Sequence, residues 1–468
     1  MQIFGGLAID KLILSYIIVL VNKITEENMS NKTYEYYGKV LKNTPFENDR
    51  KEAYLPYSED LSALKKEFIL AGRTLNNRIE YQPMEAQDSL PDGSPSETTF
   101  ERYKKLARGG ASILWFEAVS ICREGRSNPR QLEITDENVD VFARLVSEMK
   151  SACYESCGFE PIIIMQMNHS GRYSKPEGTP APITAYYNPD IDSEAKLIAT
   201  DEYLDSLVPK FIHTALLAEK AGFDGIDTKA CHGYLMSELL SAYDREGKYG
   251  GSFENRSRLF RDVCKGVNES CKKEFIRAAR INVFDGYPCS KYSFGRNEES
   301  DELYDLTEAK LLADIFEENG GQILNVTMGS PYRNPDVSRP YRKGLDTPKS
   351  NAIYALSRLW SGAAEIKATH SFAVVNTGVS LLGEFSPEAA AGAVKENMTD
   401  FVGFGRMSFA YPELAGDILS GTFQKARACV CCGGCSYLKK NLCEAGCIAR
   451  SEYYKEIFKN YRRTLGGK

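Results

Sequence analysis

Short apolar runs recur along the chain from Ile79 onward, and amphipathic segments separate them. There are eight such runs, each rich in Ile, Val and Phe, at Ile79–Pro83, Ser112–Phe116, Pro161–Gln166, Asp224–Thr228, Ile276–Asn282, Gln322–Thr327, Phe372–Asn376 and Asp400–Phe404. Clean alternation of polar and apolar positions is missing from them, which indicates strands buried on both faces of a parallel sheet. The segment Thr200–Ala221 carries Leu204, Leu207, Phe211 and Ala215 at helical spacing and predicts one of the intervening helices.

Eight strand–helix alternations predict an α/β fold, a parallel (β/α)₈ TIM barrel. The rival, a doubly wound sheet, usually carries a Gly-x-Gly-x-x-Gly turn after an early strand. Here Gly403 and Gly405 follow the eighth run instead, and Arg406 comes next. The pattern therefore favours the barrel.

The two ends of the chain differ from the barrel region. Near the N-terminus, Leu12–Val21 is apolar but shorter than the roughly 20 residues that span a bilayer, and a small-residue cleavage site does not follow it. Met29 would also serve as a natural cytosolic start. We expect an N-terminal extension over residues 1–57, disordered or mis-started in part and without stable membrane insertion. The barrel would cover residues 58–427, and a cysteine-rich tail residues 428–468.

Composition narrows the function classes. Hydrophobic residues make up 43% and charged residues 26%, as in an ordinary soluble enzyme. A net charge of −6 gives no basic patch, so a nucleic-acid partner is not expected. Because a disulfide scaffold normally belongs to a much shorter secreted chain, the clustered cysteines indicate a reducing, cytoplasmic location.

Six of the 13 cysteines lie in the last forty residues. Four of them are separated by two, two and eleven residues, namely Cys429, Cys432, Cys435 and Cys447, and Cys431 and Cys443 are additional. Thiolates at such spacing can hold a [4Fe–4S] cluster. A zinc site of four cysteines and a group of free thiols are the alternatives.

Polar residues and glycines follow the predicted strands at their C-terminal ends, where barrels build active sites. They are Met84 and Glu85, Ala118, Gln166, Lys229, His232 and Tyr234, Arg280, Gly378, and Gly405 with Arg406. The amide of Gln166 and the guanidinium of Arg280 suit the carbonyl and N1 edge of a flavin ring. Glycines with Arg406 suit a phosphate. The structural alternatives are a polar barrel layer and glycines that merely end strands.

Several ordered motifs carry a family resemblance: Asn77–Ile79 with Gln82–Met84, Gly109–Ala111, Glu117–Ala118, Gln166–Arg172, Ala221–Gly225, His232–Leu235, Tyr249–Arg256 and Gly405–Arg406. In these motifs the chain resembles the Old Yellow Enzyme family of FMN-dependent reductases. Its cysteine tail is similar to the iron–sulfur branch, which includes 2,4-dienoyl-CoA reductases and bile-acid or enoate reductases. The resemblance implies a barrel with FMN at its mouth, hydride delivery to the β-carbon of an activated alkene, and protonation of the α-carbon by a side chain.

Position by position, the resemblance implies that the flavin is contacted by Gln82, Pro83, Met84, Ala118, Gln166 and Arg280. Gly378, Gly405 and Arg406 would hold its phosphate. Tyr234 falls at the proton donor, and an ordinary tyrosine pKa near 10 suits that role.

The chain departs from the family pattern at two cavity positions. Lys229 and His232 stand where relatives use a His or Asn pair to bind the substrate carbonyl, and Glu85 stands where they use Thr or Cys to tune the flavin. We hypothesise that Lys229 and Glu85 form an ion pair. In the tail, the second cysteine gap is one residue shorter than in the branch, which Gly433 and Gly434 would absorb.

The expected function is that of an FMN-dependent ene-reductase acting on an α,β-unsaturated carbonyl compound, such as a steroid, a bile acid or an enoate, in a homo-oligomer. Larger relatives append a Rossmann-type module, whereas this chain ends at Lys468. Electrons are therefore expected from NAD(P)H bound at the flavin or from a separate donor protein. The alternatives are a flavin-dependent amine dehydrogenase or demethylase, and a non-redox barrel whose zinc-binding tail contacts a partner.

Overall fold

Eight parallel strands form a closed barrel at the centre of the computed structural model, which describes residues 27–192, 197–341 and 348–466. In barrel order the strands are β3 (Ile79–Tyr81), β4 (Ile113–Ser120), β5 (Ile162–Asn168), β8 (Gly225–Ala230), β9 (Ile276–Phe284), β10 (Ile323–Met328), β11 (Ala373–Asn376) and β12 (Phe401–Phe404). β12 pairs with β3 and closes the ring. Each strand overlaps one predicted run and is buried along its whole length, which confirms the (β/α)₈ barrel.

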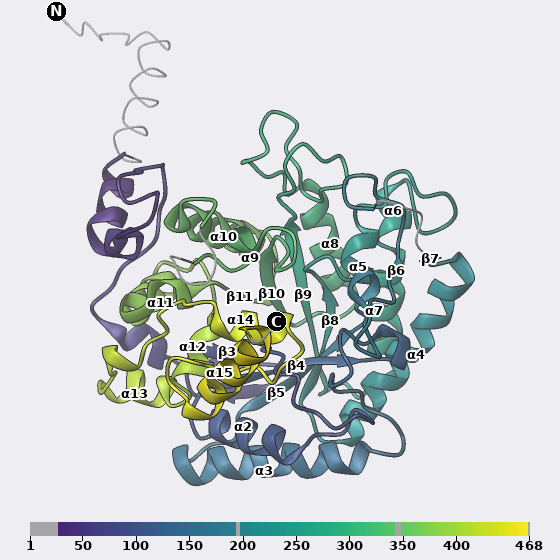
Figure 1. Cartoon of the computed structure of the whole chain (residues 1–468), viewed down its shortest axis with the longest axis horizontal. Helices are drawn as coiled ribbons and strands as arrows, with labels where there is room; N and C mark the ends of the chain where they lie inside the picture. Colours follow the sequence, from purple (N-terminus) through teal and green to yellow (C-terminus); the bar gives the residue numbers. More distant parts are fainter. Residues whose placement is uncertain (1–26, 193–196, 342–347, 467–468) are drawn as a thin grey trace, which may run out of the picture.

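Helices surround the strands (Figure 1). The main ones are α2 (Glu97–Ala107), α3 (Val139–Cys157), α4 (Asp201–Lys220), α7 (Arg258–Ser270), α8 (Thr307–Glu318), α10 (Ala352–Lys367) and α11 (Ser386–Lys395), with the short α12 (Arg406–Ala410) and α13 (Leu414–Ser420) after β12. α4 confirms the helix predicted at 200–221. Its N-cap is Thr200, whose Oγ1 accepts the N–H of Tyr203, and its apolar stripe faces the core.

A short antiparallel hairpin packs against the interior of the barrel. Its strands are β1 (Phe68–Leu70) and β2 (Arg73–Leu75). Leu70 and Leu75 belong to the same apolar cluster as Trp115, which lies inside the barrel. The sequence Arg-Thr-Leu of β2 contains a single apolar residue and forms no apolar run, so the hairpin was not predicted.

The described part of the N-terminal extension, residues 27–57, packs on the outside of the barrel. Residues 27–37 are helical, and the turn η1 (Gly38–Leu41) follows. Tyr34 and Tyr37 are buried, and the Tyr37 hydroxyl donates to the Pro56 carbonyl at 2.5 Å. The apolar run Leu12–Val21 lies outside the described residues. Within the described ranges, none of the helices is both long and apolar enough to cross a membrane.

The cysteine-rich tail returns across the barrel to the loop that follows β3. It contains α14 (Gly434–Lys440) and α15 (Glu452–Gly466), drawn in yellow in Figure 1. The Ala445 N–H donates to the Ala86 carbonyl at 2.8 Å, and Arg130 pairs with Glu444 at 2.8 Å. Both contacts fix the tail to the loops above β3 and β4.

The N-terminal segment should contribute measurably to stability. Tyr37→Ala removes a fully buried ring and should lower the free energy of unfolding by roughly 3–5 kcal/mol, as other large-to-small core substitutions do. Tyr154→Ala removes an exposed ring on α3 and should change it little. Denaturant unfolding of both variants measures the difference, and equal effects would show that the segment is not part of the core.

Candidate active site

A cavity of about 280 Å³ opens at the C-terminal ends of the barrel strands. All the residues predicted for catalysis and for cofactor binding line it: Gln82, Pro83, Met84, Glu85, Ala118, Gln166, Lys229, His232, Tyr234, Arg280, Gly378, Gly405 and Arg406. They come from seven of the eight strands or from the loops directly after them. The barrel thus brings them together, and their individual roles remain predictions.

Two buried carboxylates beneath the cavity orient the amides of its floor. Gln166 donates from Nε2 to Asp227 at 2.6 Å, and Trp115 donates to the same carboxylate oxygen at 2.8 Å. Glu80 accepts from Gln82 Nε2 at 2.8 Å. Burial raises the pKa of Asp227, and it raises the pKa of Glu80 well above its usual value. Because Nε2 of Gln166 is held from below, its carbonyl oxygen is the end left to receive a donor in the cavity.

The other end of the cavity is built from glycine and arginine. Gly378, after β11, has a φ of +90°, and a Cβ there would lie 2.8 Å from Leu356. Only glycine therefore fits without strain. Arg406 is buried and donates from Nη2 to the Pro340 carbonyl at 2.8 Å. A backbone turn without side chains next to a guanidinium is a suitable anchor for a phosphate.

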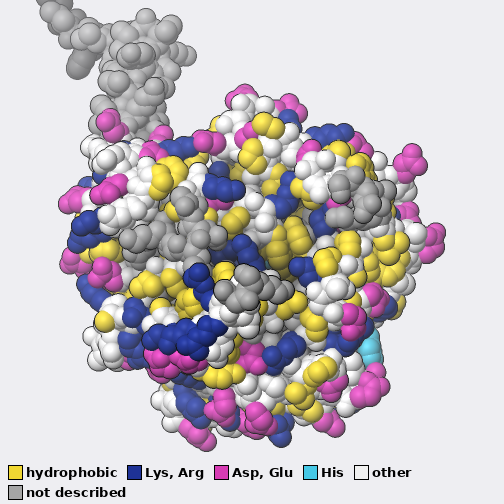
Figure 2. All heavy atoms as spheres, viewed as in Figure 1, with side chains coloured by type: hydrophobic (Ala, Val, Ile, Leu, Met, Phe, Trp, Pro, Cys, Tyr) yellow, Lys and Arg dark blue, Asp and Glu magenta, His cyan; other side chains and the backbone are white. Residues whose placement is uncertain are grey.

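The electrostatics of the lining fit an anionic cofactor. Among the described residues that line the cavity, seven are cations, namely Lys175, Lys229, Arg280, Arg339, Arg406, Lys439 and Lys440, and one is a carboxylate, Glu85. Figure 2 shows Lys and Arg side chains around the centre of this face. FMN carries a phosphate, and its ring gains negative charge when it is reduced. The amides and Arg280 of the floor together with Arg406 therefore form a donor set that fits FMN.

Tyr234, His232 and Lys229 lie together on the wall formed by β8 and its following loop. The Tyr234 hydroxyl shares a hydrogen bond of 2.8 Å with the hydroxyl of Tyr332. The Lys229 ammonium lies 4.1 Å from the centre of the Tyr234 ring. His232 adopts a φ of +68°, a strained left-handed conformation for a residue with a Cβ.

Burial sets the protonation states of these three groups. It raises the pKa of Tyr234 well above its usual value, so the phenol is a weaker acid than the ordinary tyrosine assumed from the sequence. It lowers the pKa of His232 well below its usual value, with help from the charges of Arg280 and Lys229, so the imidazole is neutral. It also lowers the pKa of Lys229 to about 8. At neutral pH the wall thus presents a protonated phenol, a neutral imidazole and an ammonium.

The hypothesised ion pair between Lys229 and Glu85 is not formed. Glu85 pairs with Lys439 of α14 at 2.5 Å, and its other oxygen accepts from Ser127 at 2.6 Å and from Asn128 at 2.7 Å. Burial favours the neutral form of Glu85, but the charge of Lys439, the hydrogen bonds from Lys439 and Ser127 and the charge of Lys229 together hold the pKa of this carboxyl below its usual value. A cation from the tail therefore takes the place that the sequence suggested for Lys229.

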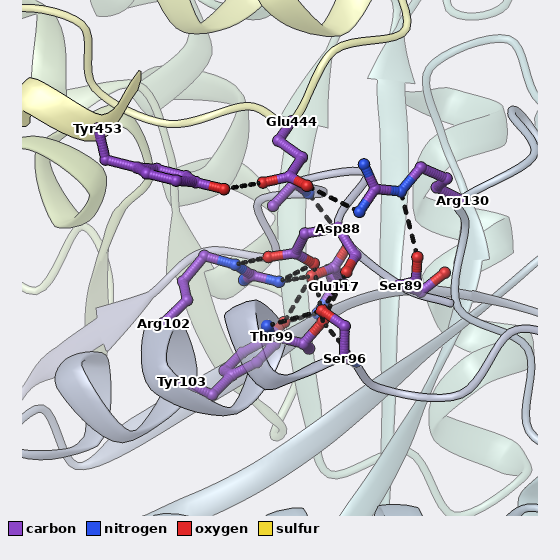
Figure 3. Close-up of polar contacts among 11 residues, drawn as sticks. Asp88, Ser89, Ser96, Thr99, Arg102, Tyr103, Glu117, Arg130, Glu444 and Tyr453 are labelled. Carbon is purple, nitrogen blue, oxygen red and sulfur yellow. Dashed lines mark hydrogen bonds and ion pairs between the residues drawn. The ribbon is translucent and has the colours of Figure 1, made fainter. Parts of the chain in front are cut away.

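A buried network holds the loop that carries Met84 and Glu85 (Figure 3). Arg102 on α2 donates to both oxygens of Asp88, at 2.8 and 2.9 Å, and to Glu117 at 2.5 Å. Glu117 in turn accepts the N–H of Ala86 at 3.1 Å. Burial raises the pKa of Glu117 to about 7. Because Asp88, Ala86 and Glu85 lie in one short loop, this network fixes the cavity wall after β3.

The tail cysteines surround a second, smaller cavity. It is lined by Cys429, Cys431, Cys432, Cys435 and Cys447, together with Arg406, which also lines the main cavity. The Cys431 N–H donates to the Cys429 sulfur at 3.4 Å. Cys443 does not line this cavity. Within the described residues no group of three or more His, Cys, Asp or Glu side chains is close enough to hold a single metal ion.

Several residues of the cavity were not predicted. Tyr332 and Arg339 belong to the proline-rich segment after β10, and Tyr173 and Lys175 to the one after β5. Long loops at this end of a barrel commonly shape substrate access, which could have pointed to them. Ser436, Lys439, Lys440 and Leu442 come from the tail, and no local signal marks them.

Comparison with known proteins places these observations in a family. The NADH:flavin oxidoreductase / NADH oxidase family matches residues 68–318, more than half of the chain. The NADH oxidase of Thermoanaerobacter brockii is 28% identical over 372 residues, which are 77% of this chain and 51% of that protein. The chain thus spans about half the length of the first curated relatives it matches.

Two solved structures share the fold. A 2-naphthoyl-CoA reductase complex superposes with a TM-score of 0.70 at 20% identity, over 85% of this chain and 58% of that one. The Old Yellow Enzyme homologue of Zymomonas mobilis superposes with a TM-score of 0.57 at 21% identity, over 77% of this chain and 93% of that one.

Replacing Lys229 should stabilise the flavin-free chain. The pKa of Lys229 is lowered to about 8 in the folded state, so its charge costs about 3 kcal/mol below pH 8, and this cost disappears as the pH rises toward 10.5. Lys229→Met should therefore raise the free energy of unfolding at pH 7 and much less at pH 10. Lys440→Met, at an exposed cavity residue, is the control and should change neither value. A destabilised Lys229→Met variant would contradict this.

Proposed function

The chain belongs to the NADH:flavin oxidoreductase / NADH oxidase family, and on that basis we propose that it is an FMN-dependent ene-reductase. It would use NAD(P)H to reduce the C=C bond of an α,β-unsaturated carbonyl compound. One observation carries the proposal: a single cavity unites the phenol of Tyr234 with amides and a guanidinium suited to a flavin ring and with Arg406 suited to its phosphate.

FMN, when bound, would supply a hydride to the β-carbon of the alkene. The chain's own residues would do the rest. His232 and Lys229 would hold the carbonyl oxygen, where negative charge develops as the hydride arrives. Tyr234 would give its phenolic proton to the α-carbon, so that one O–H bond breaks and one C–H bond forms.

Tyr332 would restore the proton of Tyr234. The two hydroxyls are 2.8 Å apart, and Tyr332 stacks on Tyr173 with ring centres 3.9 Å apart, which holds it in place. Tyr332 is 38% exposed, so it connects the buried Tyr234 to water. The phenolate formed on Tyr234 would take the proton of Tyr332, which solvent then replaces.

Loss of the proton donor should slow alkene reduction but not the reduction of the flavin. Tyr234→Phe should lower the rate of alkene reduction about 100-fold or more, because general acid catalysis is lost. Flavin reduction by NAD(P)H should keep its rate, since that step does not use the phenol. Stopped-flow measurement of each half-reaction with 2-cyclohexenone tests this, and Tyr187→Phe, at an exposed tyrosine, is the control. Equal rates of alkene reduction in wild type and Tyr234→Phe would exclude this role.

For the tail we propose a [4Fe–4S] cluster on Cys429, Cys432, Cys435 and Cys447. The support is that these four thiols surround one cavity, next to a guanidinium that also lines the flavin cavity. A four-iron cluster is larger than one ion, so its ligands stand farther apart than those of zinc, in keeping with thiols that are not grouped closely enough for a single ion. Such a centre would pass single electrons to the flavin from a separate donor protein, whereas NAD(P)H would reduce the flavin directly by hydride transfer.

Metal content tests this assignment. Anaerobically purified protein should contain about four iron atoms and four sulfides per chain, the composition of such a cluster. Cys447→Ser should lose most of both, whereas Cys443→Ser, at the cysteine outside the small cavity, should keep them. Zinc in place of iron, or retention of the iron in Cys447→Ser, would refute the cluster.

A further inference from the structure

Lys229 is a buried cation without a carboxylate partner. It is 7% exposed, lies near the end of β8 and faces the cavity. Its neighbour across the strand pair is Arg280 of β9, another cation that lines the cavity. No ion pair of Lys229 occurs in the part of the chain that the structure describes; its ammonium lies over the face of the Tyr234 ring. Glu80 and Asp227 partly offset the charge of Arg280 from below. The buried Lys229 ammonium therefore favours an anion in the cavity.

The carboxylate that lines the cavity, Glu85, is already engaged by other donors. Glu85 is the only acidic residue among the described residues that line the cavity. One of its oxygens accepts from Ser127 and Asn128, and the other accepts from Lys439. Both oxygens are thus occupied by donors other than Lys229, which leaves the Lys229 ammonium for a ligand.

Hydrogen bonds of the tail backbone hold Lys439 next to Glu85. It lies on α14, between Cys435 and Cys447. Its carbonyl accepts from the Gln87 side chain at 3.2 Å, and the Ala445 N–H bonds to the Ala86 carbonyl. Two further hydrogen bonds therefore join the tail to the loop after β3 next to the Lys439–Glu85 ion pair.

We propose that Lys229 binds the carboxylate of an α,β-unsaturated acid, and that Lys439 keeps Lys229 free for it by occupying Glu85. The proposal rests on the ene-reductase function above and narrows its substrate class. A neutral ketone would leave the ammonium charge uncompensated, whereas a carboxylate neutralises it. Hydride addition to a free enoate builds a second negative charge beside the first, and the ammonium offsets it in the product-forming state. Lys439 acts here as a positioning residue.

Binding of two matched, non-reducible ligands tests the first half of the proposal. Flavin-loaded, full-length protein is titrated calorimetrically with 3-phenylpropanoate and with 3-phenylpropanamide, which have nearly the same size and shape but differ in charge, since the neutral amide replaces one carboxylate oxygen with an NH₂ group. The carboxylate should bind at least about tenfold more tightly, as buried charge pairs do relative to neutral partners. Lys229→Met should abolish this preference, and Lys459→Met, on the exposed face of α15, should keep it.

Lys439 variants test the second half. Lys439→Met frees Glu85, which then pairs with Lys229, so the carboxylate preference should fall about tenfold as well. Lys439→Arg should retain the preference, because it restores the ion pair. Adding Glu85→Gln to Lys439→Met should recover it, since the competing carboxylate is gone. If Lys439 only stabilised the fold, replacing the buried Glu85 as well would not restore the carboxylate preference.

Any of three results overturns the proposal: a wild type without preference for the carboxylate, a Lys229→Met variant that keeps the preference, or a Lys439→Met variant that binds like the wild type. Reduction of neutral 2-cyclohexenone by the same preparation reports separately on the ene-reductase function. A protein that reduces the enone but ignores the charge of the ligand would retain that function and lose only the substrate assignment.

Discussion

Pairing of β12 with β3 is the constraint on which the rest of the molecule depends. Val402 lies in register with Ile79, so residues more than 300 positions apart become neighbours. Because all eight strands are parallel, closure also brings all their C-terminal ends to one side. Gln82 after the first strand and Arg406 after the last therefore share one cavity, and the tail that leaves β12 meets the loop that leaves β3.

Charge is distributed unevenly between the cavity and the structure beneath it. The carboxylates Asp227 and Glu80 lie below the floor and hold its amides, while the charged side chains that line the cavity are, among the described residues, cations apart from Glu85. Such an arrangement costs folding energy, since unpaired buried charge is destabilising. It is repaid when anionic ligands bind. A site organised in this way favours binding over the stability of the ligand-free protein.

Much of the fold follows from the sequence, because each barrel strand is buried on both faces and therefore appears as an apolar run. The cavity residues on the barrel strands could be anticipated for the same reason, since each comes near or just after the C-terminal end of such a run. The Glu85–Lys439 ion pair could not, because it joins positions 354 residues apart and no local pattern in the tail points toward the loop after β3. The weakened acidity of Tyr234 also escaped prediction, since it arises from burial by Tyr332 and its surroundings.

The double attachment of the tail also bears on how this protein can change over evolutionary time. A cysteine-rich segment looks like a cassette that could be exchanged between barrels. Here, however, Lys439 compensates a carboxylate on the barrel, and Arg406 of the barrel forms part of the wall around the tail thiols. A tail taken from another protein would leave Glu85 uncompensated, and a barrel without Glu85 would leave Lys439 as a surplus cation. The two parts are therefore bound to evolve as a unit, and chimeras that divide the chain near residue 428 would need matched changes on both sides of the junction.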